Sequence, residues 1–320
     1  MTDYLNRCQF GDVRAVLRQM IADGVKVNCI VTSPPYWGLR SYLPADHADK
    51  PMEIGSEPTL KEFIASMTEV FMLAREVLAD DGTCWINMGD AYAGGRGFTD
   101  STTASRRRDD HEIPRSDVRV DGLKPKDLMG QPWRLAFALQ NAGWWLRQDI
   151  IWHKPNPMPE SVRDRCTKAH EYLFLLSKSD RYFFDADAIK ESGAGQREWN
   201  EDTRGDGRDW RADGGAGSRA AKGPSGFGTP DKRNRRSVWT IPTQPYKGAH
   251  FATFPESLVE PCILAGCPAG GTVLDIFMGS GTTAHVAERL GRKWIGIDLD
   301  VRNEALQRGR LRQPSLELAA

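Results

Sequence analysis

The stretch T272-VLDIFMGSGTTAHVAERLGRKWIGID-298 decides the fold of this chain. The apolar run 272–277 predicts a buried parallel strand, and 278–290 predicts a glycine-containing turn that opens a helix. The run 293–298 predicts the next strand. Backbone N–H groups at such a turn surround a ligand at the carboxyl end of the first strand. Asp298 ends the second strand, where a carboxylate accepts hydrogen bonds from both hydroxyls of a ribose, so we expect a nucleoside-containing ligand.

The glycine pattern alone does not identify that ligand. Gly279, Gly281 and Ala284 satisfy G-x-G-x-x-G/A, which fits a nicotinamide dinucleotide as well as S-adenosylmethionine. Position is more informative, because only 22 residues follow Asp298. The remaining strands of the sheet must therefore come from the N-terminal part of the chain. This order predicts a circular permutation with the two termini close together.

The rest of the chain alternates between strand and helix patterns. We predict strands at 27–32, 83–88 and 145–152, helices at 60–79, 132–141 and 256–265, a turn at 80–82, and a hairpin formed by 172–176 and 181–184. Such alternation is typical of an α/β fold with a doubly wound, mostly parallel sheet.

Composition sets few limits on function. Among 320 residues, 43 Lys and Arg balance 43 Asp and Glu, so a nucleic-acid surface must be a local cluster. No apolar run approaches the roughly 18 to 20 residues of a membrane span, and the first residues lack the pattern of a secretion signal. The six cysteines include no C-x-x-C pair. We expect a soluble, cytoplasmic protein without membrane association or a metal site.

The segment T32-SPPYW-37 follows a predicted strand and lies at the edge where open α/β sheets bind ligands. The amino group of cytosine or adenine is a poor nucleophile because its lone pair is delocalised into the ring. Acceptors beside its hydrogens favour an attacking geometry, and the Ser33 hydroxyl and a main-chain carbonyl held by two prolines supply them. Tyr36 offers a flat face to a base that has been flipped out of a duplex. A rigid turn over a core edge is the simpler interpretation, which the nucleoside-type loop in the same sheet disfavours.

With both loops in place, the sequence resembles the permuted, β-class DNA amino-methyltransferases, in which S/D-P-P-Y precedes the cofactor motif. The matching strings are Gly11-Asp12, TSPPYW (32–37), IIWHKPNPMPESV (150–162), HEYLFLLSKS (170–179), HFATFPESL (250–258), LDIFMGSGTT (274–283) and IGIDLD (295–300). The resemblance implies a seven-stranded, Rossmann-like methyltransferase sheet that is circularly permuted and carries a small, loop-rich target-recognition insertion.

The resemblance also assigns residues to the two ligands. It places Asp275, Phe277, Gly279, Ser280, Gly281 and Thr282 on the methionine side of S-adenosylmethionine and Asp298 on the ribose, with Phe254, Pro255 and Glu256 closing over the cofactor. It places Ser33, Pro34, Pro35 and Tyr36 around the target base, with Trp37, Trp152, His153 and Lys154 nearby. The family often has proline where Ile276 stands. We expect a structural or phosphate-contacting role for His153, because methylation of a neutral amine needs little proton transfer before attack.

Three segments follow from this interpretation. Residues 1–189 form the catalytic half with a flexible insertion at about 93–126, residues 190–236 form the target-recognition insertion, and residues 237–320 form the cofactor-binding half. The recognition segment has eleven Lys and Arg against eight Asp and Glu. Its DNA-contacting candidates are Arg204, Arg208, Arg211, Arg233, Arg235 and Arg236, with Trp199 and Trp210 for stacking.

The function implied is site-specific methylation of double-stranded DNA by S-adenosylmethionine. By the same resemblance, serine at position 33 favours N4 of cytosine, and N6 of adenine stays open because the same acceptors fit either amine. A homodimer and a cognate restriction endonuclease are compatible partners. A nucleic-acid-binding protein without turnover and a nicotinamide-dependent oxidoreductase are the less favoured alternatives.

Overall fold

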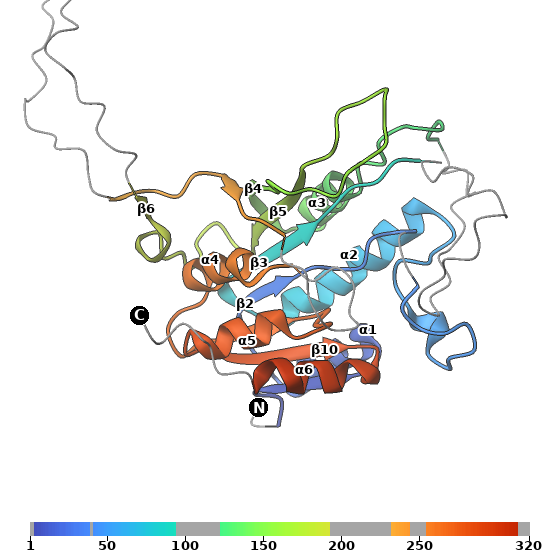
Figure 1. Cartoon of the computed structure of the whole chain (residues 1–320). Helices are drawn as coiled ribbons and strands as arrows, with labels where there is room; N and C mark the ends of the chain where they lie inside the picture. The colour runs from blue at the N-terminus through green and yellow to red at the C-terminus, as the bar shows by residue number, and fades with distance from the viewer. Residues whose placement is uncertain (1–2, 39–40, 94–121, 193–231, 244–253, 313–320) are drawn as a thin grey trace, which may run out of the picture.

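The computed structural model describes residues 3–38, 41–93, 122–192, 232–243 and 254–312. An eight-stranded sheet runs through it in the order β1-β10-β9-β2-β3-β5-β4-β8 (Figure 1). The strands are β1 (Arg7–Phe10), β2 (Val27–Thr32), β3 (Leu78–Met88), β4 (Trp145–His153), β5 (His170–Ser177), β8 (Val238–Thr240), β9 (Thr272–Asp275) and β10 (Lys293–Asp298). The short strands β6 (Glu191–Ser192) and β7 (Lys232–Arg233) form a separate pair. The helices are α1 (Val13–Ala22), α2 (Leu60–Val77), α3 (Gln131–Asn141), α4 (Glu256–Gly266), α5 (Thr282–Arg289) and α6 (Glu304–Leu311).

The sheet is mostly parallel, as the sequence predicts. The strands β1, β10, β9, β2 and β3 form parallel neighbours, and β5 is antiparallel to both β3 and β4. The hairpin predicted from 172–176 and 181–184 is wrong, because β5 pairs with β3 and β4, while 181–184 forms no strand. The implied seven strands become eight, because β8 adds to the edge beside β4.

The predicted permutation is confirmed by the pairing of the chain's two ends. Strand β1 lies parallel to β10 with Phe10 opposite Asp298. The amide of Gly11 then donates to the carbonyl of Asp298 at 2.9 Å. Strands from the N-terminal half and the C-terminal half thus form one sheet.

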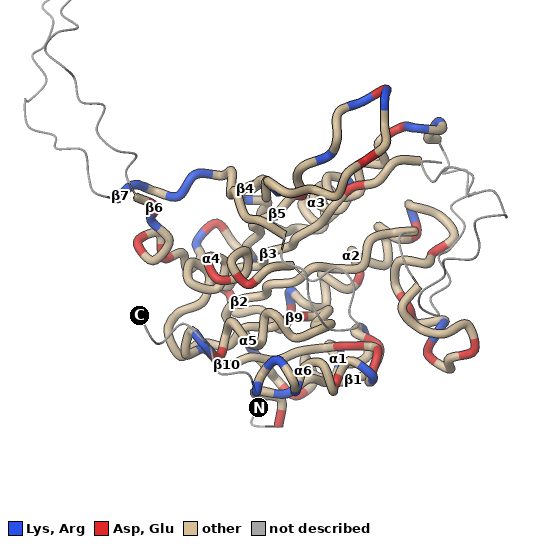
Figure 2. The backbone as a smooth tube through the Cα atoms, viewed as in Figure 1, with Lys and Arg blue, Asp and Glu red and all other residues tan. Residues whose placement is uncertain are grey.

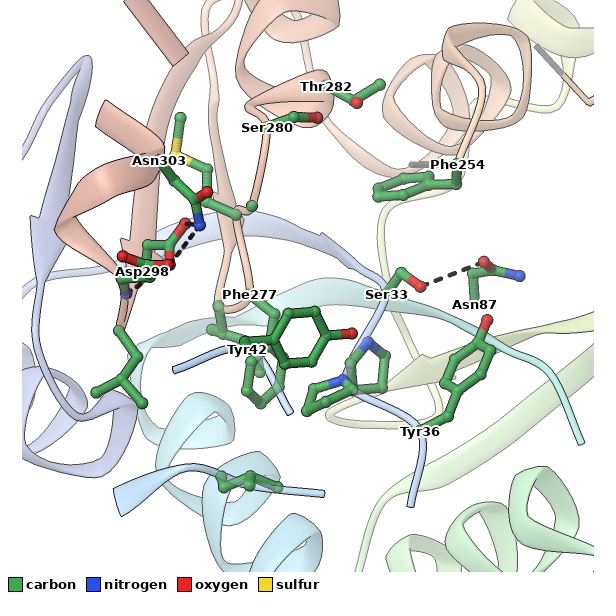
Figure 3. A pocket seen from close by; sticks show the side chains of 18 of the residues that line it. Ser33, Tyr36, Tyr42, Asn87, Phe254, Phe277, Ser280, Thr282, Asp298 and Asn303 are labelled. Carbon is green, nitrogen blue, oxygen red and sulfur yellow. Dashed lines mark hydrogen bonds between the residues drawn. The ribbon is translucent and has the colours of Figure 1, made fainter. Parts of the chain in front are cut away.

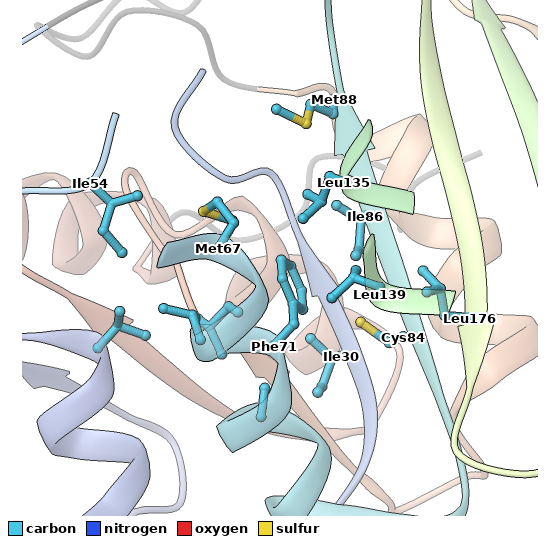
Figure 4. Packing of buried hydrophobic residues seen from close by; sticks show 14 of the residues in the cluster. Ile30, Ile54, Met67, Phe71, Cys84, Ile86, Met88, Leu135, Leu139 and Leu176 are labelled. Atoms are coloured by element: carbon cyan, nitrogen blue, oxygen red, sulfur yellow. The ribbon is translucent and has the colours of Figure 1, made fainter. Parts of the chain in front are cut away.

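Successive side chains of the central strands point to opposite faces of the sheet, and each face is covered by an apolar layer. Ile30 and Ile86 pack against α1, α2 and α3 on one face (Figure 4), whereas Cys29, Val31 and Trp85 pack against α4 and α5 on the other. Complete burial of aromatic and aliphatic side chains such as Phe63 and Phe71 in α2 is the main force holding these helices to the sheet.

The ends of α2 follow from local chemistry. Thr59 and Glu62 form a capping box at its start, with the Thr59 hydroxyl accepting from the Glu62 amide at 3.2 Å. The predicted turn at 80–82 lies inside β3 as a bulge, because Val27 pairs with Leu78 and the next pair is Cys29 with Thr83. Strand pairing therefore begins immediately after the helix.

Four strands end along one edge of the sheet. Thr32 ends β2, Asp275 ends β9, Asp298 ends β10 and Met88 ends β3. Strand β10 follows β9 on one side and β3 follows β2 on the other, so the strand order reverses between β9 and β2, which is the position where open α/β sheets bind ligands. Among the described residues, no helix combines the length and apolar character needed to cross a bilayer.

Candidate active site

A cavity of about 750 Å³ opens at this edge of the sheet and reaches from β10 to β4. Both loops singled out in the sequence line it, with Ser33 to Tyr36 on one side and Phe277 to Ser280 with Asp298 on the other. Figure 3 shows Asp298 and Asn303 at one end and Ser33, Asn87 and Tyr36 at the other. One cavity therefore joins the nucleoside end to the proline loop.

At the nucleoside end, Asp298 is held rigidly. Its carboxylate accepts from the amide of Asp300 at 2.9 Å, from the side-chain amide of Asn303 at 3.0 Å and from that of Gln307 at 3.1 Å. Burial raises the pKa of Asp298 to about 7, against the lowering effect of the hydrogen bonds from Asp300 and Asn303. An acceptor so placed fits the two hydroxyls of a ribose.

A side chain of α6 holds the glycine loop between β9 and α5 in place. Gly281 has φ +82°, a left-handed conformation that a side chain would strain. The side-chain amide of Gln307 donates to the Gly279 carbonyl at 2.9 Å as well as to Asp298. Gln307 therefore ties the glycine loop to the end of β10.

Asp275 holds the neighbouring strands together. Its carboxylate accepts from the hydroxyls of Thr32 at 2.7 Å and Thr283 at 2.6 Å and from the Phe277 amide at 3.1 Å. It is buried and does not line the cavity, and burial raises the pKa of its carboxyl group. Its placement does not support the expected contact with the cofactor, and it supports a positioning role instead.

At the other end of the cavity, Ser33 is oriented by Asn87. The Ser33 hydroxyl donates to the Asn87 side-chain carbonyl at 3.4 Å (Figure 3). The Asn87 amide in turn donates to Glu171 at 3.3 Å and to the Tyr172 carbonyl at 3.2 Å. The Ser33 side chain also lines the cavity, where its oxygen has lone pairs that can accept from a bound donor.

Glu171 joins the remaining polar groups of this wall. One of its oxygens accepts from the Tyr36 hydroxyl at 2.9 Å, and the other forms an ion pair with Lys154. Lys154 also lies over the ring of Trp152, with its ammonium 4.3 Å from the ring centroid. Burial and the Glu171 carboxylate raise the pKa of Tyr36, which keeps the phenol protonated.

The cavity contains most of the expected site residues. It is lined by Ser33, Pro34, Pro35, Tyr36, Trp152, Lys154, Phe254, Phe277, Gly279, Ser280, Thr282 and Asp298. Gly281, Pro255, Glu256, Trp37 and His153 do not line it.

Their contacts explain why. Trp37 packs in the core, and its ring N–H donates to the Glu57 carbonyl at 2.8 Å, so it does not lie beside a base in this cavity. Pro255 precedes the first residue of α4, and Glu256 lies 3.8 Å from His285. The His153 ring shares a hydrogen bond of 3.1 Å with the Thr240 hydroxyl, which ties β4 to β8.

The described arginines of the segment expected to read the DNA sequence, residues 190–236, do not line the cavity. Arg233 and Arg236 both pair with Glu191, at 2.9 and 2.6 Å, and the Arg235 guanidinium lies 4.5 Å from the centroid of the Trp239 ring. Figure 2 shows basic residues along this segment between β7 and β8. The other candidates, Arg204, Arg208, Arg211, Trp199 and Trp210, fall outside the described residues, as does most of the insertion predicted at 93–126.

The arrangement matches a known family. A family model of N6 and N4 methyltransferases, described as DNA methylase, matches residues 27–305. The chain belongs to the DNA methylase family. It is 43% identical over 302 residues to the Type II methyltransferase M.SmaI of Serratia marcescens, covering 94% of this chain and 89% of that protein. It is 44% identical over 296 residues to the Type II methyltransferase M.Cfr9I of Citrobacter freundii, covering 91% of this chain and 82% of that protein.

Solved structures share the fold of this DNA methylase. The PvuII DNA methyltransferase (cytosine-N4-specific) superposes with a TM-score of 0.61 at 17% identity, covering 97% of this chain and 87% of that one. A putative DNA modification methylase from Thermus thermophilus, solved with S-adenosyl-L-methionine, gives a TM-score of 0.54 at 22% identity, covering 95% of this chain and 92% of that one.

The donors and acceptors of the cavity fit the cofactor of this S-adenosylmethionine-dependent family. The Asp298 carboxylate suits the ribose, and the apolar faces of Ile54, Phe277 and Phe254 suit a purine ring and a thioether chain. The Thr282 hydroxyl and the amides of the glycine loop suit a carboxylate. No cluster of three or more metal-ligating side chains occurs in the described part of this DNA methylase.

Four polar residues of the site were not singled out from the sequence, namely Asn87, Glu171, Asn303 and Gln307. Glu171 lies in the string HEYLFLLSKS, which carried the resemblance without a role for its acid. Asn87 follows a buried apolar run in β3, where a polar side chain at the strand end is a usable signal. Asn303 and Gln307 lie beyond Asp298 in a polar segment with no apolar periodicity to mark a helix.

Proposed function

We propose that this DNA methylase transfers a methyl group from S-adenosylmethionine to N4 of a cytosine that has been flipped out of double-stranded DNA. The observation that carries the proposal is the single cavity lined by the Ser33–Tyr36 loop at one end and by Asp298 at the other. A nucleoside cofactor and a base entering from opposite ends would meet between these two walls.

Bound S-adenosylmethionine supplies an electrophilic methyl group on its sulfonium. The chain's own residues orient it: Asp298 accepts from the ribose hydroxyls, and Thr282 with the glycine-loop amides holds the carboxylate. Phe277 and Phe254 exclude water from the space between cofactor and base.

The base end of the cavity activates the amine. The Ser33 oxygen and a carbonyl of the proline loop accept the two amino hydrogens, which weakens conjugation of the nitrogen lone pair with the ring. The Asn87 side-chain carbonyl accepts a hydrogen bond from the Ser33 hydroxyl at 3.4 Å, which leaves the lone pairs of the Ser33 oxygen free to accept from the base. Tyr36 stacks on the base, while its hydroxyl is occupied by Glu171 at 2.9 Å.

Two observations support cytosine. Position 33 is serine, and a structural neighbour with the same fold is described as cytosine-N4-specific. We propose the segments 1–189 and 237–320 as the two halves of the catalytic domain. The insertion 190–236 would act as the target-recognition element that reads the sequence, with Arg233, Arg235 and Arg236 at its described end near the phosphates.

The relatives are Type II methyltransferases, which are parts of restriction-modification systems. We therefore propose that a cognate endonuclease recognises the same sequence.

The test is nucleoside analysis together with methylation-sensitive long-read sequencing of DNA from cells that express the protein. We expect N4-methylcytosine at a single short sequence, and none in cells that express the Tyr36→Ala variant. N6-methyladenine without N4-methylcytosine would overturn the choice of base, and no modified base at all would contradict the activity.

A further inference from the structure

Met158 is the most exposed large apolar side chain in the described part of the chain, at 85% exposure, and it also lines the active-site cavity. The next most exposed, Val238, reaches 57%. A side chain that is nearly fully exposed and still borders the cavity must stand at its mouth. Single exposed apolar residues are common on protein surfaces, so position and rigidity have to decide whether this one has a role.

The backbone around Met158 is unusually constrained. Pro157 and Pro159 flank it, so two φ angles are fixed and Met158 itself is kept extended by the proline that follows it. Met158 belongs to the loop that joins β4 to β5, residues 154–169, and this loop projects from the edge of the sheet (Figure 1). A methionine presented in this way keeps a flexible side chain on a fixed base.

The start of the loop is fastened to the protein body. The Asn156 side-chain amide donates to the Thr243 carbonyl at 3.2 Å, and its side-chain carbonyl accepts from the Thr243 amide at 2.9 Å. This reciprocal pair fixes the loop two residues before Met158. Lys154 is anchored below it through Glu171 and Trp152.

The end of the loop is fastened as well. Arg165 pairs with Glu160 at 2.5 Å, and its guanidinium lies 4.0 Å from the centroid of the Tyr92 ring. The ion pair between Lys126 and Asp164 at 2.6 Å joins the loop to the segment before α3. Figure 2 shows basic residues on this projecting loop and on its neighbour. The contacts of Arg165 and Lys126, together with the Asn156–Thr243 pair, therefore hold both ends of the loop that carries Met158.

We propose that Met158 is a wedge that enters the base stack of the duplex and fills the space left by the flipped target base. The inference rests on the proposed function, in that a base must leave the duplex to reach Ser33. Apolar side chains, methionine among them, are inserted between base steps by other DNA-bending proteins. Met158 lies at the mouth of the cavity that receives the base. When the protein docks onto DNA, Met158 would therefore separate the stacked bases and fill the space that the flipped base leaves.

The test compares Met158→Ala, Met158→Leu and the wild type on two duplexes that carry the site identified by sequencing. In one duplex the target base is paired, and in the other it lies opposite an abasic position, which lowers the cost of flipping. We expect Met158→Ala to lose about tenfold in kcat/KM on the paired duplex, corresponding to part of the few kcal/mol of unstacking, and less than about twofold on the abasic duplex. Met158→Leu should stay close to the wild type.

Ile21→Ala removes another exposed apolar side chain, on α1 and away from the cavity, and serves as the matched control. Calorimetry with S-adenosylmethionine should give the same affinity for all four proteins. An equal loss on both duplexes, or wild-type activity of Met158→Ala on the paired duplex, would refute the wedge. Failure of the proposed function is seen separately, since the wild type would then modify neither duplex at cytosine.

Discussion

At the scale of single residues, the ionisation of Asp298 links ligand binding to pH. Its pKa of about 7 in the folded chain reflects burial, and its ordinary value is 3.8. The folded chain therefore binds this proton more tightly than the unfolded chain does. The stabilising contribution of the protonated form is complete below about pH 4 and is lost as the pH rises through 7.

Burial favours the protonated form of Asp298, whereas binding of the ribose hydroxyls requires the carboxylate. Only the carboxylate accepts from both ribose hydroxyls, so the affinity for S-adenosylmethionine should fall as the pH drops from 8 to 6. Asp298→Asn should weaken binding by at least about tenfold at pH 8, in line with one lost charge-assisted hydrogen bond, and should remove the pH dependence. Calorimetry across this range measures both effects. An unchanged affinity at pH 6 would show that the carboxylate does not contact the ribose.

Glu171 is the second residue whose substitution should have a specific effect on methylation. Glu171→Ala would leave Lys154 without its ionic partner and Asn87 without one of its two acceptors, so the Ser33 orientation should relax. Single-turnover methylation should slow by about 100-fold, whereas Glu171→Gln, which keeps an acceptor for Tyr36, should recover at least tenfold of that loss.

Cofactor binding supplies the control for Glu171. Both variants should bind S-adenosylmethionine with wild-type affinity, because Glu171 lies at the base end of the cavity. A Gln variant as slow as the Ala variant would point to the charge, rather than the hydrogen bonds, as the requirement.

Some residues of the site could be predicted from the sequence, and others could not. Asp298 and Ser33 are recognisable because each follows a predicted strand within a short motif. Glu171 and Asn87 contact each other because β5 pairs antiparallel with β3. The local sequence pattern does not reveal this strand pairing. The misplaced hairpin therefore also concealed part of the site.

At the scale of elements, the packing of β10 against the glycine loop sets the position of the cofactor wall. A Cβ added to Gly296 would lie 1.8 Å from the Met278 sulfur, and Met278 lines the cavity. Gly296→Ala should therefore push Met278 out of place. We expect a loss of about 1–3 kcal/mol in unfolding free energy, a Tm lower by about 5 °C, and weaker binding of S-adenosylmethionine.

Gly309 provides the matched control within α6. It sits in a helix interior, and an added Cβ would meet nothing within 4 Å. Gly309→Ala should hold or raise the Tm, since alanine favours the helix by up to about 1 kcal/mol. Equal Tm values for the two variants would mean that Met278 has room to rotate away.

Most elements follow from periodicity, and those that do not have identifiable reasons. Strands β2 and β10 have the predicted limits because they are short β-branched or apolar runs with clear ends. Strand β1 has the sequence RCQF and carries little apolar signal, and its position at the sheet edge comes from pairing with the distant β10. Helix α6 is polar on most of its surface and is defined by contacts of Gln307 with the glycine loop.

At the scale of the whole molecule, the permutation rests on the parallel pairing of β1 with β10, which joins the strands of the N-terminal half to those of the cofactor-binding half. The proposed recognition segment, residues 190–236, is attached to the sheet in a different way. Strands β6 and β7 pair Glu191 with Arg233 and Ser192 with Lys232, so the chain leaves and returns at adjacent points. We therefore expect that residues 193–231 can be replaced without changing the connections of the sheet.

A deletion tests this modular arrangement. Replacing residues 193–231 with a four-residue Gly/Ser turn should leave the Tm within about 3 °C of the wild type and the affinity for S-adenosylmethionine unchanged, because the core and cavity residues that the structure describes lie in other segments. Site-specific methylation should fall by more than about 100-fold, since readout of the sequence would be lost. Gel shifts should show residual, salt-sensitive binding without sequence preference. Retained methylation at the original site would place recognition elsewhere, and loss of cofactor binding would show that the segment supports the catalytic domain itself.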